Sequence, residues 1–143
     1  MRRFLFALAL SSALLSLSIG GVRAAMTMAT VQLRPPANIH MMALAHATGT
    51  ARISYTKQDA DINLTADNLP RPAALHANAY VLWLVGGTHK VNAGRLKING
   101  NMAGLHTMTM DVMFSKLVVT AERSATTMKP MGTKVLTGAV MRH

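Results

Sequence analysis

Three residues of this chain have types and a spacing that could bind a soft metal ion. His106, Met108 and Met110 alternate along the sequence, so a β-strand would project an imidazole and two thioethers from one face. Imidazole and thioether groups are ligands that suit Cu(I) in an exported protein. The run His40-Met41-Met42 adds further groups of the same kind, in a chain with 12 Met. The sequence therefore offers copper or silver binding as an alternative function.

Packing in the protein core explains the same spacing. A core-facing strand also places apolar residues at every second position, and methionine is an adaptable core filler. Leu105, Thr107 and Thr109 would then form the solvent-facing side of the strand. We favour this interpretation, which predicts buried methionines and no bound cofactor.

No set of residues in the sequence predicts catalysis. Beyond the N-terminal segment the serines are Ser54, Ser115 and Ser124, and none lies in a Gly-x-Ser-x-Gly motif. Asp and Glu total 5 without a pair suited to acid–base chemistry, and no phosphate-loop, zinc-helix or calcium-loop motif occurs. The chain has no Cys, which excludes a thiol nucleophile and a cysteine-ligated zinc site. We therefore predict a protein that is not an enzyme.

The N-terminal residues predict export from the cytoplasm. Arg2-Arg3 precede an apolar segment, residues 4–19, and Val22 and Ala24 are small residues suited to a cleavage site after Ala24. The apolar segment is shorter than the roughly 20 residues that a membrane-spanning helix needs. A signal peptide over residues 1–24 is therefore expected, with a periplasmic or secreted product. Membrane anchoring is the alternative if the segment is retained.

The chain is strongly basic, with a formal net charge of +10. Nucleic acid is the usual partner of such a charge, but export argues against it. An envelope protein partner is expected instead, together with contact with an anionic membrane surface or the cell wall. Within the expected strand 90–98, Arg95 and Lys97 are predicted to form a solvated face opposite Leu96 and Ile98.

The pattern of apolar residues predicts an all-β fold. Residues 80–85 form an unbroken apolar run that contains Trp83, the only Trp, and predict a strand buried on both faces. Gly86-Gly87 and Asn99-Gly100 are hairpin signals. We expect an antiparallel β-sandwich, Ig-like or similar, over residues 48–143, after an extended or poorly ordered segment at residues 25–47. About seven strands are predicted, at residues 51–57, 61–66, 80–85, 90–98, 102–110, 116–122 and 134–141.

Several short motifs, in order, resemble the extracytoplasmic C-terminal domain of the anti-sigma-K factor family. They are Leu69-Pro70, Tyr80-Val81-Leu82-Trp83-Leu84, Ala93-Gly94-Arg95-Leu96, Val119-Thr120-Ala121-Glu122, and Pro130 with Gly132 and Gly138. The resemblance covers roughly residues 48–140. It implies a β-sandwich sensor domain without catalytic residues, on the outer face of the cytoplasmic membrane.

The chain also departs from that family. Only Met1-Arg2-Arg3 precede the apolar segment, so the sigma-binding part and the membrane-spanning part of the family are expected to be missing. The predicted function is therefore that of the sensor domain alone: a regulatory binding module that acts through an envelope protein partner.

Overall fold

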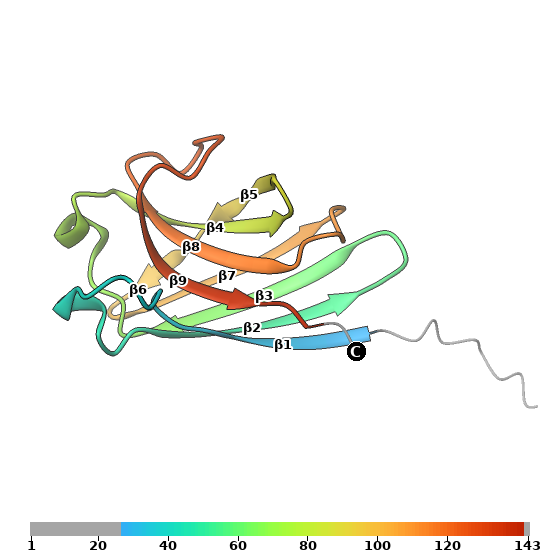
Figure 1. Ribbon diagram of the computed structural model, residues 1–143, viewed down its shortest axis with the longest axis horizontal. Coiled ribbons are helices and arrows are strands. Elements are labelled where there is room, and N and C mark those ends of the chain that lie inside the picture. Colours follow the sequence, from blue (N-terminus) through green and yellow to red (C-terminus); the bar gives the residue numbers. More distant parts are fainter. Residues whose placement is uncertain (1–26, 142–143) are drawn as a thin grey trace, which may run out of the picture.

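The computed structural model describes residues 27–141, which form two antiparallel sheets packed face to face (Figure 1). Sheet A has the strand order β1-β2-β3-β7-β6, and sheet B has the order β5-β4-β8-β9. This confirms the predicted all-β sandwich. The elements are β1 (Thr27–Leu33), η1 (Met42–Leu44), β2 (Thr48–Tyr55), β3 (Ala60–Asp67), η2 (Pro72–Leu75), β4 (Ala79–Gly86), β5 (His89–Arg95), β6 (Lys97–Asn99), β7 (Met102–Thr109), β8 (Lys116–Glu122) and β9 (Thr133–Ala139).

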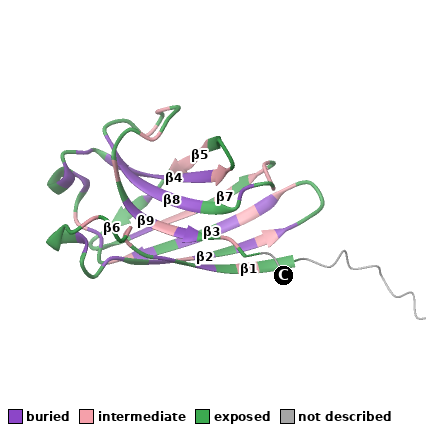
Figure 2. Ribbon diagram, in the orientation of Figure 1, coloured by how far each residue is buried: buried purple, intermediate pink, exposed green. Residues whose placement is uncertain are grey.

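The main hydrophobic core lies between the two sheets. In β2 and β3 every second residue faces inward, as the alternating sequence predicts, and Ile53 pairs directly with Ile62. Phe114 and Tyr80 are among the largest side chains of this core. Full burial of one Leu or Ile contributes about 1.5–3 kcal/mol, so the facing sheets stabilise each other. Figure 2 shows the buried residues concentrated along β4 and β8.

The central strand β4 is buried on both faces, as predicted. Tyr80, Leu82 and Leu84 point into the main core, whereas Val81 and Trp83 belong to a second hydrophobic cluster. Because side chains alternate along a strand, this second cluster lies on the outer face of sheet B. A cover segment, residues 123–132 between β8 and β9, packs over it through Ala125.

The strand expected at residues 90–98 is in fact two strands in different sheets. Gly94 has a φ of 132°, and the chain bends there so that Leu96 enters the core while its N–H donates to the Tyr80 carbonyl at 2.9 Å. Residues 89–95 therefore pair in sheet B and residues 97–99 in sheet A. The expectation that Leu96 and Ile98 share a buried face is wrong, since Ile98 is exposed.

One side of the sandwich is closed by contact between β1 and β9. Arg34 and Thr137 exchange backbone hydrogen bonds of 3.0 and 2.8 Å across the two sheets. The approach requires Gly138, because a Cβ there would lie 2.6 Å from the Gln32 carbonyl oxygen. β1 lies in the segment predicted to be extended or poorly ordered, residues 25–47, and pairs with β2 as an ordered strand, whereas β6 arises from the division of the strand predicted at residues 90–98.

Candidate functional site

The structure places His106 and Met108 on the outer face of sheet A, and the expectation that they pack in the core is wrong. Met108 is 66 % exposed, and Met110, just beyond the end of β7, is 84 % exposed. The inward side of the strand carries Leu105, which pairs with the buried Leu64 and packs against the main core. The side of β7 that carries Leu105 therefore packs against the core, although the sequence predicts that this side faces solvent.

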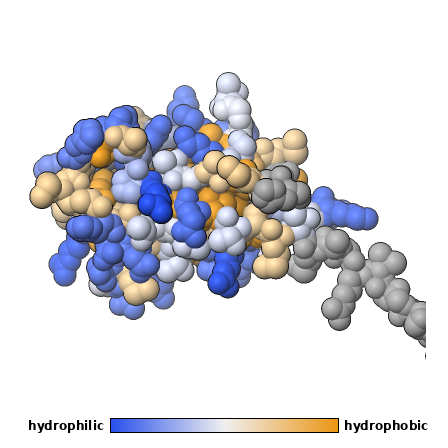
Figure 3. All heavy atoms as spheres, turned by 60° about the horizontal axis from the view of Figure 1, so that its bottom comes forward, coloured by the Kyte–Doolittle hydropathy of each residue, from blue (hydrophilic) through white to orange (hydrophobic). Residues whose placement is uncertain are grey.

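Every methionine within residues 27–141 is exposed, so methionine does not fill the core. Leu, Ile, Val, Ala and aromatic side chains fill it instead. Single exposed apolar side chains are ordinary, whereas adaptable methionines that gather in one patch are typical of contact surfaces. Figure 3 shows moderately hydrophobic residues scattered among hydrophilic ones over the face seen there. The exposed methionines are Met28, Met41, Met42, Met102, Met108, Met110, Met113, Met128, Met131 and Met141.

The imidazole of His106 is held by the carboxylate of Asp61, a contact that the spacing of the two residues in the sequence does not predict. The His106 Nε2 atom lies 2.9 and 3.0 Å from the two carboxylate oxygens of Asp61, on the neighbouring strand β3. No group of three or more His, Asp, Glu or Cys residues that could hold a metal ion occurs within residues 27–141. A soft-metal site here would need Met110, which lies beyond the end of β7, to join Met108 and the Asp61-bound imidazole.

The motifs that carry the family resemblance meet at two hydrogen-bonded positions. At the first, the Tyr80 hydroxyl donates to the Pro70 carbonyl oxygen at 2.6 Å, which fastens the Leu69-Pro70 segment to β4. Burial raises the pKa of Tyr80 to about 12, because the ionised phenolate would lose its hydration. The hydroxyl therefore stays a neutral donor in the folded protein.

Folding stability is expected to fall between pH 10 and about 12 through the ionisation of Tyr80. The pKa of Tyr80 is raised on folding from 10.0 to about 12, so its stabilising effect is complete below pH 10 and is lost as the pH rises to the folded value. The expected loss is about 2–3 kcal/mol. Urea unfolding of the wild type and of Tyr80→Phe, below pH 10 and near pH 12, measures it. A stability difference between the two proteins that does not change with pH would contradict this assignment.

At the second position a buried carboxylate fastens the cover segment. The Trp83 Nε1 atom donates to the Thr120 hydroxyl oxygen at 2.8 Å, and that hydroxyl donates to Glu122 Oε1 at 2.7 Å. The same oxygen accepts the backbone N–H groups of Met131 and Gly132 at 2.9 and 3.1 Å. Glu122 is only 3 % exposed, so these bonds satisfy a desolvated charge. Glu122 and Trp83 therefore hold the cover segment against sheet B.

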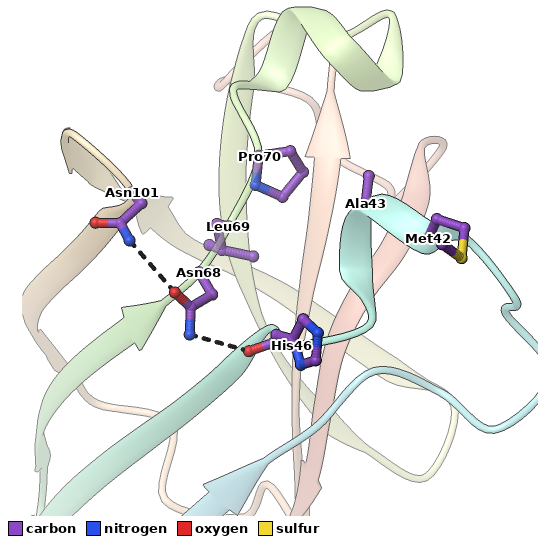
Figure 4. A pocket seen from close by; sticks show the side chains of 7 residues that line it. All are labelled: Met42, Ala43, His46, Asn68, Leu69, Pro70 and Asn101. Carbon is purple, nitrogen blue, oxygen red and sulfur yellow. Dashed lines mark hydrogen bonds between the residues drawn. The ribbon is translucent and has the colours of Figure 1, made fainter.

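A hollow of about 520 Å³ lies beside η1, at one end of the sandwich (Figure 4). The Asn68 side-chain amide, next to the end of β3, donates to the His46 carbonyl oxygen at 3.2 Å and accepts from the Asn101 amide at 3.3 Å. Met42, 91 % exposed, stands at the rim. The hollow is shallow and open to solvent, and its apolar side chains lie beside amide groups that bond to each other and to the backbone. Its lining residues are Met42, Ala43, His46, Asn68, Leu69, Pro70 and Asn101.

Comparison with known proteins places the chain in a family. Among residues 27–141 there is no helix with the length and apolar character needed to cross a membrane. Neither a curated protein nor a solved structure matches the chain. The family model described as "Anti-sigma-K factor rskA, C-terminal" matches residues 5–134. The match begins in the apolar N-terminal segment, earlier than the resemblance in the motifs, and ends before Gly138. Since it covers more than half of the sequence, the chain belongs to the anti-sigma-K factor C-terminal domain family.

Proposed function

We propose that the chain is an exported regulatory module that acts by binding an envelope protein partner and not by catalysis. Membership of a family of anti-sigma factor domains supports the regulatory role. The observation that carries the binding role is the hollow beside η1, with Met42 exposed at its rim. An exposed apolar side chain next to amide donors and acceptors forms the kind of surface that a protein segment covers.

A photoreactive residue in place of Met42 tests the proposed partner contact. In cells, we expect a covalent adduct with one defined envelope protein, and no adduct from the same residue at Thr30, which is exposed on the outer face of sheet A. Ala43→Arg places a long side chain in the hollow, so it should abolish the adduct and alter transcription as deletion of the gene does. Equal adducts from positions 42 and 30, or none, would contradict the proposal.

Export is part of this proposal and rests on the N-terminal sequence. Residues 1–24 lie outside the described residues, and we propose that they are a signal peptide cut after Ala24. The crosslinking experiment requires protein from the native envelope, and the intact mass of that protein shows whether residues 1–24 have been removed. Recovery of the uncut chain from membranes would instead assign the anchored form.

Soft-metal binding is a second candidate function, favoured by the exposure of Met108 and Met110 beside His106. It predicts stoichiometric uptake of Cu(I) under anaerobic conditions, against a chromogenic chelator. Met108→Leu/Met110→Leu should remove this uptake, whereas the control Met28→Leu/Met102→Leu should keep it. Retention of all Cu(I) by the chelator would rule this function out.

A further inference from the structure

The outer face of sheet B carries a ring of basic side chains around the Trp83 cluster. Side chains of directly paired residues point to the same face of a sheet. Val85 lies on the outer face with Trp83, and it pairs with Lys90 on one side and Lys116 on the other. Both lysines are exposed. They therefore flank Val85 on this face, one on β5 and one on β8, at one end of β4.

The opposite end of the same face is also basic. Val81 belongs to the outer cluster and pairs with Arg95, and Thr120, which binds Trp83, pairs with Lys134. The cover segment adds the exposed side chains of Arg123 and Lys129. We call these six groups the basic face; they are Lys90, Arg95, Lys116, Arg123, Lys129 and Lys134.

Carboxylates do not neutralise the basic face. Within residues 27–141 both ion pairs join a His to an Asp, at His106–Asp61 and His89–Asp111. Glu122, the acidic residue nearest the basic face in sequence, is buried beneath the cover segment and accepts its backbone N–H groups. On the outer face of sheet A, in contrast, exposed Arg52 is accompanied by Asp61 and Asp67. The positive charge is therefore concentrated on one side of the sandwich.

Two exposed apolar side chains stand among these cations. Met128 and Met131 are 85 % and 84 % exposed and flank Lys129-Pro130 in the cover segment. Figure 1 shows the connection between β8 and β9 projecting beyond sheet B, on the side away from sheet A. A protruding tip in which one lysine lies between two exposed methionines matches the boundary between lipid headgroups and acyl chains.

We propose that the basic face docks on an anionic phospholipid bilayer. Its lysines and arginines contact the headgroup phosphates, and Met128 and Met131 enter the acyl boundary. A soluble polyanion would satisfy the charges but would give the two methionines no apolar environment, which is why the bilayer is the better partner. This contact is separate from the hollow beside η1, so a partner protein could occupy that end while sheet B faces the membrane.

A fluorescent label read out at two positions tests this orientation. The chain has no Cys, so Met128→Cys and Thr30→Cys each take one environment-sensitive label in the full-length protein. With phosphatidylglycerol-containing vesicles, the label at position 128 is expected to shift to shorter wavelength and to be shielded from an aqueous quencher. The label at position 30 should stay in water, even if the apolar N-terminal segment tethers the chain to the vesicle.

Charge variants distinguish an effect of the basic face on vesicle binding from an effect of net charge. Lys90→Glu/Lys116→Glu should weaken the response at position 128 on the order of a hundredfold in lipid concentration, whereas Arg52→Glu/Lys57→Glu changes net charge equally and should leave it nearly intact. Equal loss in both pairs, or the same shift on zwitterionic vesicles, would overturn the proposal. Binding to soluble polyphosphate without any response to vesicles would also overturn it and would assign the face to polyanions. Unchanged circular dichroism confirms that each variant is folded.

Discussion

Trp83→Ala is expected to lower the free energy of unfolding by about 3–5 kcal/mol, the usual cost of removing a large buried aromatic side chain. Trp83 is fully buried between sheet B and the cover segment, in a small cluster with Val81 and Val118. Its Nε1 atom also donates to Thr120, whose hydroxyl donates to Glu122. A small cluster cannot refill the space, so the loss should be a large part of the 5–15 kcal/mol typical of a domain.

Urea unfolding followed by circular dichroism measures this loss. Trp83→Phe is the matched control, because it keeps most of the apolar volume and removes the indole N–H; it should cost clearly less than the alanine variant. Equal unfolding midpoints for Trp83→Ala and the wild type would show that the outer cluster does not stabilise the sandwich.

The sequence predicts strands and hairpins correctly where the residue types are compatible with only one environment. Residues 80–85 are apolar at every position, so only a strand covered on both faces accommodates them, and β4 has that environment. The pairs of strands joined at Gly86-Gly87 and Asn99-Gly100 also form as predicted. Local residue types are sufficient in these cases because a turn or a run of apolar side chains does not depend on distant contacts.

Prediction fails where a contact between residues far apart in the sequence determines which face of a strand is buried or where a strand ends. Leu105 and Met108 are both apolar, but Leu105 is the one that packs on the main core, where a Cβ on residue 94 would lie 3.5 Å from its side chain. The bend at Gly94, where its N–H bonds to the Asn92 side chain, divides the expected strand between two sheets. Neither contact is visible in the local pattern of apolar residues.

The sequence shows which residue types form the candidate site but not how the fold brings them together. The high methionine content points to an unusual surface or core, but only the structure shows that the described methionines are exposed. His106 and Asp61 are 45 residues apart and meet because β3 and β7 pair. Glu122 belongs to a motif that the sequence displays, whereas its role depends on the return of the cover segment to β8.

Gly132→Ala is expected to release the cover segment and to cost about 3–5 kcal/mol. A Cβ at residue 132 would collide with the Ala121 carbonyl oxygen and lie 2.7 Å from the carbonyl carbon, and both are backbone atoms of β8 that cannot rotate away. Overpacking of this kind costs about 1–3 kcal/mol. Displacing the segment relieves this overpacking but removes two backbone N–H groups from Glu122, and each bond to a charged group contributes about 1.5–3 kcal/mol.

Limited trypsin digestion together with urea unfolding distinguishes local release from a merely weaker fold. Arg123 starts the cover segment, so cleavage after it should accelerate in Gly132→Ala under conditions where the wild type stays intact, because proteolysis follows the population of the open form. Gly104→Ala is the control, since a Cβ there would meet only the Leu64 carbonyl oxygen, at 3.3 Å; it should cost under about 1 kcal/mol and leave Arg123 protected. Protection of Arg123 in Gly132→Ala, with an unchanged unfolding midpoint, would mean that Glu122 and Ala121 do not hold the cover segment against sheet B.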